Sequence, residues 1–526
     1  MSESGPDAPQ GANDESETGA PRRPERPPVR ALDPATAMRL TDGHPPLPAL
    51  YLSDRLLVSN GPGGAPRDIE DLREALGRLD LDFEVTPRPD GGPRDLDRAT
   101  WGTSITLKPT RSPIDPVDAW SVLQRLREAG DPVAERLSLE HVLRPADGYW
   151  GGVGGYWGGV GGYWGGVGGY WGGVGGYWGG VGSALQEYSV PGRGGRMPVA
   201  LALPDPRLRA RAVDRNPVVV VPDTAIAAHP WFKDGDGVVR LVLKEGRLVP
   251  LLTTGAGDPV DPPISVPPAA EPVGLLQGHA TFIAGLIRQG CPEATIVSIP
   301  VMGDDGVVDE SVMLDVLQAL LDRHVHGQDQ GVEADVVDVL SLSLGYYAED
   351  RTYTSGPVAD MLDRFAEHGV LVVAGVGNDG TDAPFVPAAL AAEPPQRITA
   401  KAVPPLASVG ASNPDGVSVA LFSNNLPVVS AIRAGVSVVS TLPLTNGMGQ
   451  PSSEVRSGDT VRCTVDPDDY TGGFGVWSGT SFSTPVFAAE LAAALIDEGG
   501  LTDTSSHAMR RRAIRALRTC IGRVRS

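Results

Sequence analysis

The sequence predicts an α/β protein in which a small α+β module precedes a three-layer domain with a mostly parallel central sheet. Residues 215–526 alternate short β-branched runs such as VVVVP (218–222) with longer amphipathic runs, a pattern typical of strands and helices in a parallel sheet. Residues 49–147 instead follow the order β-α-β-β-α-β, which is that of a ferredoxin-like module. A chain of 526 residues is also too long for one ordinary core.

Five regions follow from composition. The first is a Pro-, Gly- and Glu-rich tail that we expect to be disordered. The second is the ferredoxin-like module, and the third is the heptad GYWGGVG repeated five times without change. An irregular entry segment leads into the large α/β domain. In chain order the regions span residues 1–48, 49–147, 148–182, 183–214 and 215–526.

The elements of the small module are predicted from periodicity. Helical faces recur every three to four residues, as in Ile69, Leu72, Leu76 and Leu79, and the strands are short runs between turn residues. We expect strands at 55–59, 82–87, 103–109 and 136–143, and helices at 66–79 and 116–130.

The large domain is predicted in the same way. After the run at 218–222 we expect strands at 294–302, 334–345, 370–375, 406–412 and 436–442, and helices at 309–325, 357–369 and 483–499. In a sheet of this kind the ligand site lies at the carboxyl ends of the strands. Side chains that follow those strands are therefore the candidates for function.

Charge and cysteine content narrow the class of protein. The 65 acidic residues outnumber 44 basic ones and give a net charge of −21, which argues against nucleic acid or anionic lipid as a partner. Three scattered cysteines form neither a disulfide framework nor a zinc motif. The sequence contains no signal-peptide pattern and no apolar run long enough to span a membrane. We therefore expect a cytoplasmic protein, with leaderless export as the alternative.

Four polar residues stand at the ends of predicted elements in the large domain. Asp223 directly follows the first strand, His279 opens a helical run, Asn378 follows the strand at 370–375, and Ser481 begins the long helix. Singly, each fits a turn or a helix cap. Together they supply a nucleophile, a base, a carboxylate to orient the base, and an amide donor, which is the set that serine hydrolysis needs.

The motifs around these residues resemble those of the subtilisin-like serine proteases, or subtilases. DTAIAAHP resembles the family's Asp motif, GHATFIAG its His motif, AGVGNDG its Asn motif and SGTSFSTP its Ser motif, in the family's chain order. The resemblance covers residues 215–526. It implies that Ser481 is the nucleophile, His279 the general base, Asp223 the orienting carboxylate, and Asn378 an oxyanion donor beside the Ser481 backbone amide. The family also implies protein or peptide substrates.

The resemblance further implies a substrate-binding edge and a pocket floor. SLSLG resembles the edge that pairs with an extended substrate. These implied residues are Ser341, Leu342, Ser343, Leu344, Gly345, Ala374, Gly375, Val376 and Gly377. Three residues depart from the family pattern: Ala225 and Ala280 replace glycines, and Phe282 replaces a histidine.

No cofactor is expected to be required. Subtilases commonly bind structural calcium, and Asp466, Asp468 and Asp469 form an acidic loop that could supply ligands. Their spacing matches no calcium loop. We therefore assign no metal site.

Two questions stay open in the N-terminal half. The ferredoxin-like module is interpreted as an inhibitory propeptide, as in many subtilases, with a permanent adaptor domain as the alternative. The Gly-rich heptads exclude a helix and predict a tether that spans roughly 30 to 35 Å as a random coil. They are interpreted as a neutral expansion, as cleavage or pseudo-substrate sites, or as a segment that binds a partner. A catalytically silent scaffold that binds peptides is the alternative function for the whole chain.

Overall fold

The structure is a computed structural model. It describes residues 29–59, 69–89, 92, 102–111, 116–145, 195–201, 203–232, 237–251, 276–303, 306–351, 353–446, 451 and 453–522. The heptads and the first part of the entry segment lie outside these ranges, so their predicted structure stays a prediction.

The large domain is built on an eight-stranded sheet, and its α/β class is confirmed. All neighbouring strands run parallel except the last pair. In spatial order the strands are β17 (Ala431–Ala434), β16 (Ala407–Ser412), β14 (Leu371–Gly375), β12 (Val339–Leu342), β7 (Val218–Asp223), β10 (Thr295–Pro300), β8 (Val238–Lys244) and β9 (Arg247–Pro250).

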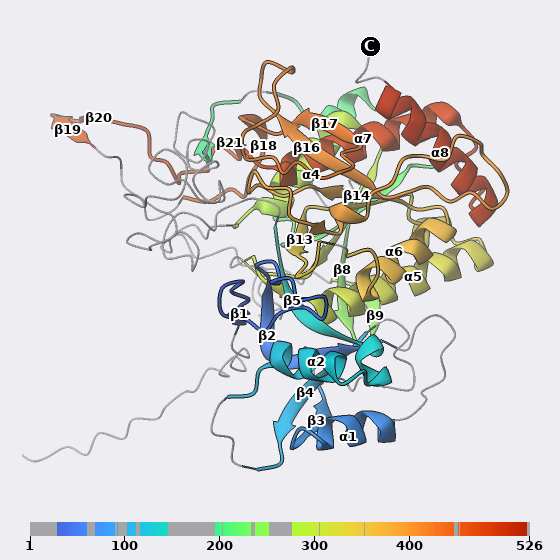
Figure 1. Cartoon of the computed structure of the whole chain (residues 1–526). Helices are drawn as coiled ribbons and strands as arrows, with labels where there is room; N and C mark the ends of the chain where they lie inside the picture. Colours follow the sequence, from blue (N-terminus) through green and yellow to red (C-terminus); the bar gives the residue numbers. More distant parts are fainter. Residues whose placement is uncertain are drawn as a thin grey trace, which may run out of the picture.

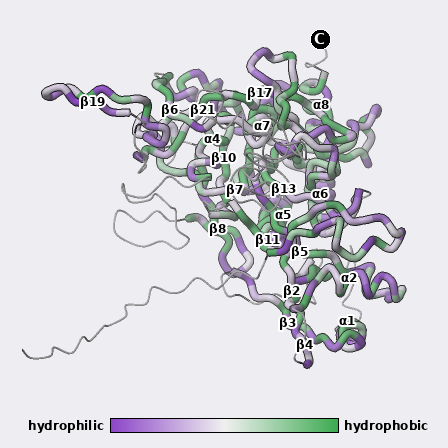
Figure 2. The backbone as a smooth tube through the Cα atoms, turned by 60° about the vertical axis from the view of Figure 1, so that its left-hand side comes forward, coloured by the Kyte–Doolittle hydropathy of each residue, from purple (hydrophilic) through white to green (hydrophobic). Residues whose placement is uncertain are grey.

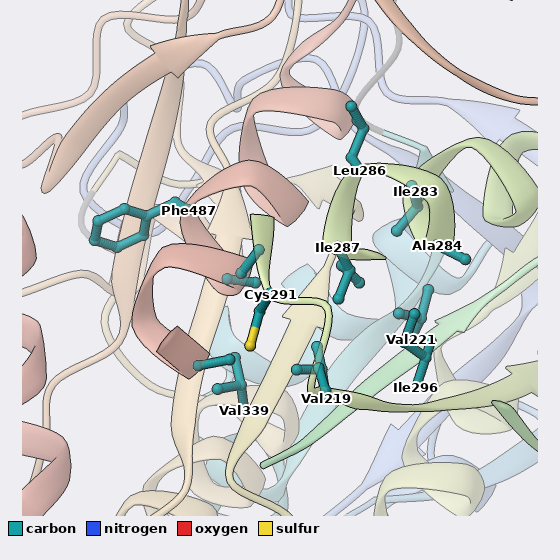
Figure 3. Close-up of a cluster of buried hydrophobic side chains, with 14 of the residues drawn as sticks. Val219, Val221, Ile283, Ala284, Leu286, Ile287, Cys291, Ile296, Val339 and Phe487 are labelled. Atoms are coloured by element: carbon teal, nitrogen blue, oxygen red, sulfur yellow. The ribbon is translucent and has the colours of Figure 1, made fainter. Parts of the chain in front are cut away.

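Helices cover both faces of this sheet and complete three layers (Figure 1). One face carries α4 (His279–Gly290), α7 (Thr480–Glu498) and α8 (Ser506–Gly522), and the other carries α5 (Glu310–Gln330) and α6 (Pro357–Glu367). Successive side chains of β7 point to opposite faces of the sheet, and all of them in the run 218–221 are valines, so β7 contributes apolar groups to both faces. Val219 and Val221 pack under α4 (Figure 3), whereas Val218 and Val220 join the core on the α5 side.

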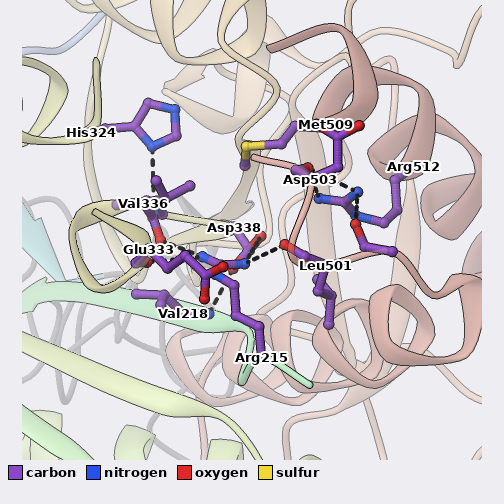
Figure 4. Close-up of polar contacts among 12 residues, drawn as sticks. Arg215, Val218, His324, Glu333, Val336, Asp338, Leu501, Asp503, Met509 and Arg512 are labelled. Atoms are coloured by element: carbon purple, nitrogen blue, oxygen red, sulfur yellow. Dashed lines mark hydrogen bonds and ion pairs between the residues drawn. The ribbon is translucent and has the colours of Figure 1, made fainter. Parts of the chain in front are cut away.

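A buried ion pair joins the beginnings of two central strands (Figure 4). The guanidinium of Arg215 lies 2.9 Å from the carboxylate of Asp338 and donates to the carbonyl of Val336 at 2.8 Å. The same carboxylate accepts a hydrogen bond of 2.9 Å from the backbone amide of Val218. Both side chains are at least 96% buried, so each charge depends on its partner.

The N-terminal module lies below the large domain in Figure 1. Its sheet has the order β5-β2-β4-β3, with every neighbouring pair antiparallel. The elements are β1 (Val29–Ala31), β2 (Leu50–Val58), α1 (Ile69–Gly77), β3 (Leu81–Val85), β4 (Thr103–Pro109), α2 (Ala119–Glu128), the 3-10 turn η2 (Pro132–Arg136) and β5 (Leu137–Pro145).

The boundary predicted at residue 48 lies too far along the chain. The strand β1 pairs with β2, and Leu32 is buried in the core of the module. The indole of Trp120 also donates to the carbonyl of Met38 at 2.9 Å. Residues 29–48 therefore belong to the module, although their composition resembles that of a disordered tail.

The strand β5 joins the two halves of the chain. It pairs with β2 on one side and, near its C-terminal end, with two strands of the large domain. These are β11 (Val308–Asp309) and β13 (Leu344–Tyr347), and β13 also pairs with β15 (Phe385–Val386). The module and the rim of the large domain therefore share one continuous sheet.

Several strands of the large domain differ from the sequence-based prediction. The strand expected at 334–345 is two strands, since β12 ends at Leu342 in the central sheet and β13 begins at Leu344 in the shared one. The strand expected at 436–442 is β18 (Val438–Thr441), which forms a separate antiparallel sheet with β21 (Phe474–Trp477) and β6 (Met197–Pro198). The β8–β9 hairpin was not predicted.

A further hairpin, β19 (Glu454–Ser457) and β20 (Thr460–Cys463), projects away from the body of the protein (Figures 1 and 2). All residues of its two strands are exposed. The remaining short 3-10 turns are η4 (Pro206–Arg209), η5 (Glu333–Asp335) and η6 (Ala388–Leu390).

Candidate active site

Asp223 is the last residue of β7, at the carboxyl edge of the central sheet. Parallel pairing with β10 and β12 holds this strand in the middle of the sheet, and the Asp223 side chain is fully buried. Its Oδ1 accepts a hydrogen bond of 2.7 Å from the backbone amide of Thr224. The sheet therefore places this carboxylate at the edge predicted for the site.

His279 is the first residue of α4 and faces Asp223. Its Nδ1 lies 2.8 Å from Oδ1 of Asp223, so the ring donates this proton to the carboxylate. Gly278, which precedes it, has φ of +82°, and a Cβ there would overlap the ring of Pro443. The turn into α4 therefore requires glycine.

Aromatic side chains pack against the His279 ring. The ring of Trp477 lies edge-on with its centroid 5.8 Å away, and that of Phe482 is tilted at 5.4 Å. Phe282, a departure from the family pattern, packs on Phe482 at 4.6 Å in the same cluster. The substitution therefore adds apolar packing one turn beyond His279.

Ser481 is the second residue of α7, close to the amino end of that helix. Its hydroxyl donates to the carbonyl of Ser343 at 3.2 Å, and the Ser343 hydroxyl donates to the Ser481 carbonyl at 2.9 Å. The helix dipole and the backbone amides of the first turn favour negative charge beside the Ser481 side chain.

Asn378 is tied to the same helix end. Its side-chain Oδ1 accepts a hydrogen bond of 2.8 Å from the backbone amide of Thr480. The Thr480 hydroxyl in turn accepts one of 3.2 Å from the backbone amide of Gly377. These contacts orient the Asn378 amide, with its oxygen toward α7 and its NH₂ group on the other side.

Contacts link the four residues predicted from motifs: Asp223 bonds His279, Asn378 bonds Thr480 beside Ser481, and the ring of Phe482, the residue after Ser481, packs on His279. Asp223, His279 and Ser481 are fully buried, and Asn378 is 1% exposed. All four side chains are therefore shielded from solvent in this structure. A substrate could not reach Ser481 without a change in this arrangement.

The residues predicted to bind substrate fall into two groups. Leu344 and Gly345 lie in β13 and pair with Pro145 and Arg144 of β5. The others lie in or between central strands: Ser341 and Leu342 belong to β12, Ser343 follows β12, Ala374 and Gly375 end β14, and Val376 and Gly377 lead to Asn378.

Several contacts that shape the site were not predicted. The hydroxyl of Thr224 accepts a hydrogen bond of 3.0 Å from the backbone amide of Ala280, which ties the Asp223 strand to the His279 helix. Tyr347 and Asp379 form another hydrogen bond beside β13. Thr224 and Asp379 both lie inside the motifs quoted above, so their positions in those motifs could have indicated a role in the site. Nothing in the sequence marked Tyr347.

In the described residues, no group of three or more His, Cys, Asp or Glu side chains is arranged to hold a metal ion. The acidic loop Asp466–Asp469 is no exception. No helix among the described parts of the chain is both long and apolar enough to cross a membrane.

Solved structures of proteases are similar to this chain at low identity. A mutant of the protease domain of PatA is 19% identical, with 58% of this chain and 95% of that chain covered and a TM-score of 0.36. The patellamide maturation protease PatA is 20% identical (54% and 80% covered, TM-score 0.34), and a lanthipeptide protease is 19% identical (53% and 72% covered, TM-score 0.33).

A family model supplies the decisive comparison. Residues 214–519, more than half of the chain, match the model described as the subtilase family. This range contains Asp223, His279, Asn378 and Ser481. The chain therefore belongs to the subtilase family of serine endopeptidases.

Proposed function

We propose that Asp223, His279 and Ser481 form the catalytic triad of this endopeptidase and that residues 29–145 hold it in an inhibited state. The observation that carries the first part is the bond of 2.8 Å between His279 Nδ1 and Asp223 Oδ1. That contact leaves Nε2 as the ring nitrogen directed away from the carboxylate, where a general base must act.

In the proposed reaction, Ser481 Oγ attacks the carbonyl carbon of a peptide bond while His279 accepts its proton. Asp223 holds the imidazole in the required tautomer and stabilises the imidazolium that forms. The proton then passes from His279 to the leaving amine, which leaves an acyl group on Ser481. A water molecule activated by His279 hydrolyses this ester and restores the enzyme.

The tetrahedral oxyanion would be stabilised by two donors. One is the backbone amide of Ser481 at the amino end of α7, and the other is the side-chain NH₂ of Asn378. The bond from the Thr480 amide to the Asn378 oxygen supports this role, because it fixes which end of the amide points away from the helix. Fixed donors of this kind lower the barrier without reorganising during the reaction.

The inhibitory role of the N-terminal module is supported by the pairing of β5 with β13 and β11. An extended substrate would bind such an edge as an added strand, and β5 already fills it from Val142 to Pro145. The complete burial of Ser481 is consistent with a silent state. The order and pairing of its elements support the ferredoxin-like interpretation of the module.

Covalent labelling of the nucleophile tests the triad. A fluorophosphonate probe is expected to label the processed form of the wild-type chain. The Ser481→Ala variant, treated in the same way, should not be labelled. Absence of label in the processed wild-type chain would contradict the proposal and favour a silent scaffold that binds peptides.

N-terminal sequencing after incubation tests the zymogen. We expect the wild-type chain to convert to a shorter form while Ser481→Ala stays intact under the same conditions. The module would not be an inhibitor if both chains stayed intact and Ser481 of the wild-type chain were fully labelled whether or not residues 29–145 were present. Versions with zero to five heptads in the same assay would separate a neutral repeat from one that sets the activation time.

A further inference from the structure

We propose that Asp379 determines the specificity of this protease by selecting an arginine or lysine side chain at the substrate position that pairs with Gly345. This inference rests on the proposed function, in which β5 occupies the place of a substrate. The residue of β5 at that position is Arg144.

The strand register places Arg144 and the acidic group on one face. Directly opposed residues of an antiparallel pair project to the same side, as do residues two apart along a strand. Arg144 lies opposite Gly345, so its side chain shares a face with Tyr347. The Tyr347 hydroxyl donates to the carboxylate of Asp379, which brings that carboxylate to the same face.

Asp379 is held in place by its surroundings. Its backbone amide donates to Asn424 Oδ1 at 3.0 Å, and Asn424 Nδ2 donates to the Tyr347 hydroxyl at 2.8 Å. The same Asn424 amide also donates to the carbonyl of Val376 at 2.8 Å. These hydrogen bonds therefore hold the Asp379 carboxylate in one position beside β13.

Charge makes this face selective. Burial raises the pKa of Asp379, and the hydrogen bond from Tyr347 and the charge of Arg144 oppose that rise. Burial likewise lowers the pKa of Arg144 to about 9, against the attraction of Asp379. A neutral substrate side chain would leave a half-buried carboxylate without a cation, and an acidic one would repel it.

Shape favours a long side chain at the same position. A Cβ on Gly345 would overlap the carbonyl oxygen of Val386 and the ring of Phe385, so β13 and β15 are closely packed beneath the paired strand. The ring of Phe385 also packs on Tyr347, with the centroids 5.1 Å apart. An arginine can extend over this aromatic surface with its apolar stem and reach Asp379 with its charged end.

The register also gives the number of residues between this substrate position and the cleaved bond. Pro145 pairs with Leu344, so a substrate in the same register would place its following residue opposite Ser343. The Ser343 carbonyl accepts the hydrogen bond from Ser481. The basic residue is therefore the third residue on the N-terminal side of the cleaved bond.

Internally quenched peptides built on Val-Leu-X-Pro-Ala test this assignment with the processed wild-type chain. X is Arg, Lys, Gln or Glu, and a further peptide carries the Arg one position later. We expect kcat/KM for Arg and Lys to exceed that for Gln by about 10-fold or more, as for a charge-assisted contact, with Glu cleaved most slowly. The peptide with the shifted Arg should lose this advantage.

The matched variants are Asp379→Asn and Asp382→Asn. Asp382 is an exposed acidic neighbour paired with Arg351, so its variant should keep the full Arg-to-Gln ratio. In Asp379→Asn the ratio should fall toward one, with fluorophosphonate labelling of Ser481 as the check on folding. Should that variant fail to label, Asp379→Glu, which keeps the charge, must retain a preference for Arg.

Two results would overturn the assignment. Equal cleavage of the Arg and Gln peptides by the wild-type chain would contradict the specificity and leave the proposed protease function intact. An unchanged ratio in a well-labelled Asp379→Asn would assign the preference to another residue. Cleavage of none of the peptides by an unlabelled wild-type chain would instead contradict the proposed function itself.

Discussion

His141 of the N-terminal module and Glu310 of the large domain form a buried pair, with 2.8 Å between Nδ1 of the ring and Oε2 of the carboxylate. The other ring nitrogen lies 3.0 Å from Glu349, and the ring stacks on Tyr346 with the centroids 4.1 Å apart. Because both nitrogens contact carboxylates, the imidazole is held as a cation. The contact between module and protease therefore depends on a proton.

Docking of the module is expected to weaken at alkaline pH. Burial lowers the pKa of His141, but the charge of Glu310 and its bonds to both carboxylates outweigh this and raise the pKa from 6.5 to about 10. A raised pKa stabilises the docked state fully below pH 6.5 and progressively less as the pH rises toward 10. Burial raises the pKa of Glu349, but the hydrogen bond and the charge of His141 outweigh burial, so the pKa is lowered. The contribution of Glu349 to docking is therefore lost only at acidic pH.

The measurement is the thermal midpoint of the full chain carrying Ser481→Ala, which prevents self-cleavage, with and without His141→Gln. The difference between the two should be largest at about pH 6.5 and should shrink by pH 10. A difference that stays constant over this range would mean that the His141 proton does not stabilise docking.

Removal of triad residues should reduce kcat by unequal amounts. Ser481→Ala and His279→Ala are each expected to lower kcat by about 10⁶-fold, and Asp223→Asn by about 10⁴-fold, as for serine protease triads in general. The double variant Ser481→Ala/His279→Ala should be no worse than either single one, because the two groups act as a unit. Additive losses in a peptide-cleavage assay would argue against this unit.

Replacement of Asn378 should affect the transition state more than substrate binding. Asn378→Leu is expected to lower kcat by about 10² to 10³-fold with little change in KM, because one oxyanion donor is lost. Asn378→Asp is the structural control, since it keeps an oxygen that can accept from the Thr480 amide but lacks the NH₂ group. If Asn378→Asp retained wild-type kcat, the amide would not be an oxyanion donor.

The buried pair of Arg215 and Asp338 is expected to stabilise the large domain. Arg215→Met leaves the Asp338 carboxylate buried without its cation and should cost about 3 to 5 kcal/mol of unfolding free energy. Arg351→Met removes an exposed pair with Asp382 and should cost less than about 1 kcal/mol. Denaturant unfolding of both variants in the Ser481→Ala chain compares them, and equal costs would contradict the role of burial.

Much of the site could be predicted because its residues stand at element ends inside short motifs. A strand buried on both faces is an unbroken β-branched run, so Asp223 was recognisable as the residue at its carboxyl end. The small residues around Ser481 and the nearby Pro485 likewise predicted that Ser481 lies near the amino end of a helix. The observed α7 begins at Thr480, so Pro485 lies within the helix and not in its first turn. These are local signals, and local signals can be read from sequence.

The features that were not predicted depend on contacts between distant residues. The predicted strand at 334–345 began too early, because Ala334 and Asp335 lie in η5 and β12 begins at Val339. From Val339 to Gly345 the sequence shows no break, and only the separate partners, β14 and β5, explain why the strand divides at Ser343. The segment at 29–48 resembles a disordered tail, yet its few apolar groups, such as Leu32, are buried by the module. Tyr347 became relevant only through Asp379, which lies far along the chain but beside it in space.

The shared sheet has a consequence for how this protease can be switched on. In the proposed function β13 can pair with either β5 or a substrate, and β5 belongs to the same chain. A tethered competitor of this kind acts at an effective concentration of the order of millimolar. Substrate that pairs with β13 as tightly as β5 does, but is present at micromolar concentration, would then lose this competition, so activity is governed by events that remove the module and not by the supply of substrate.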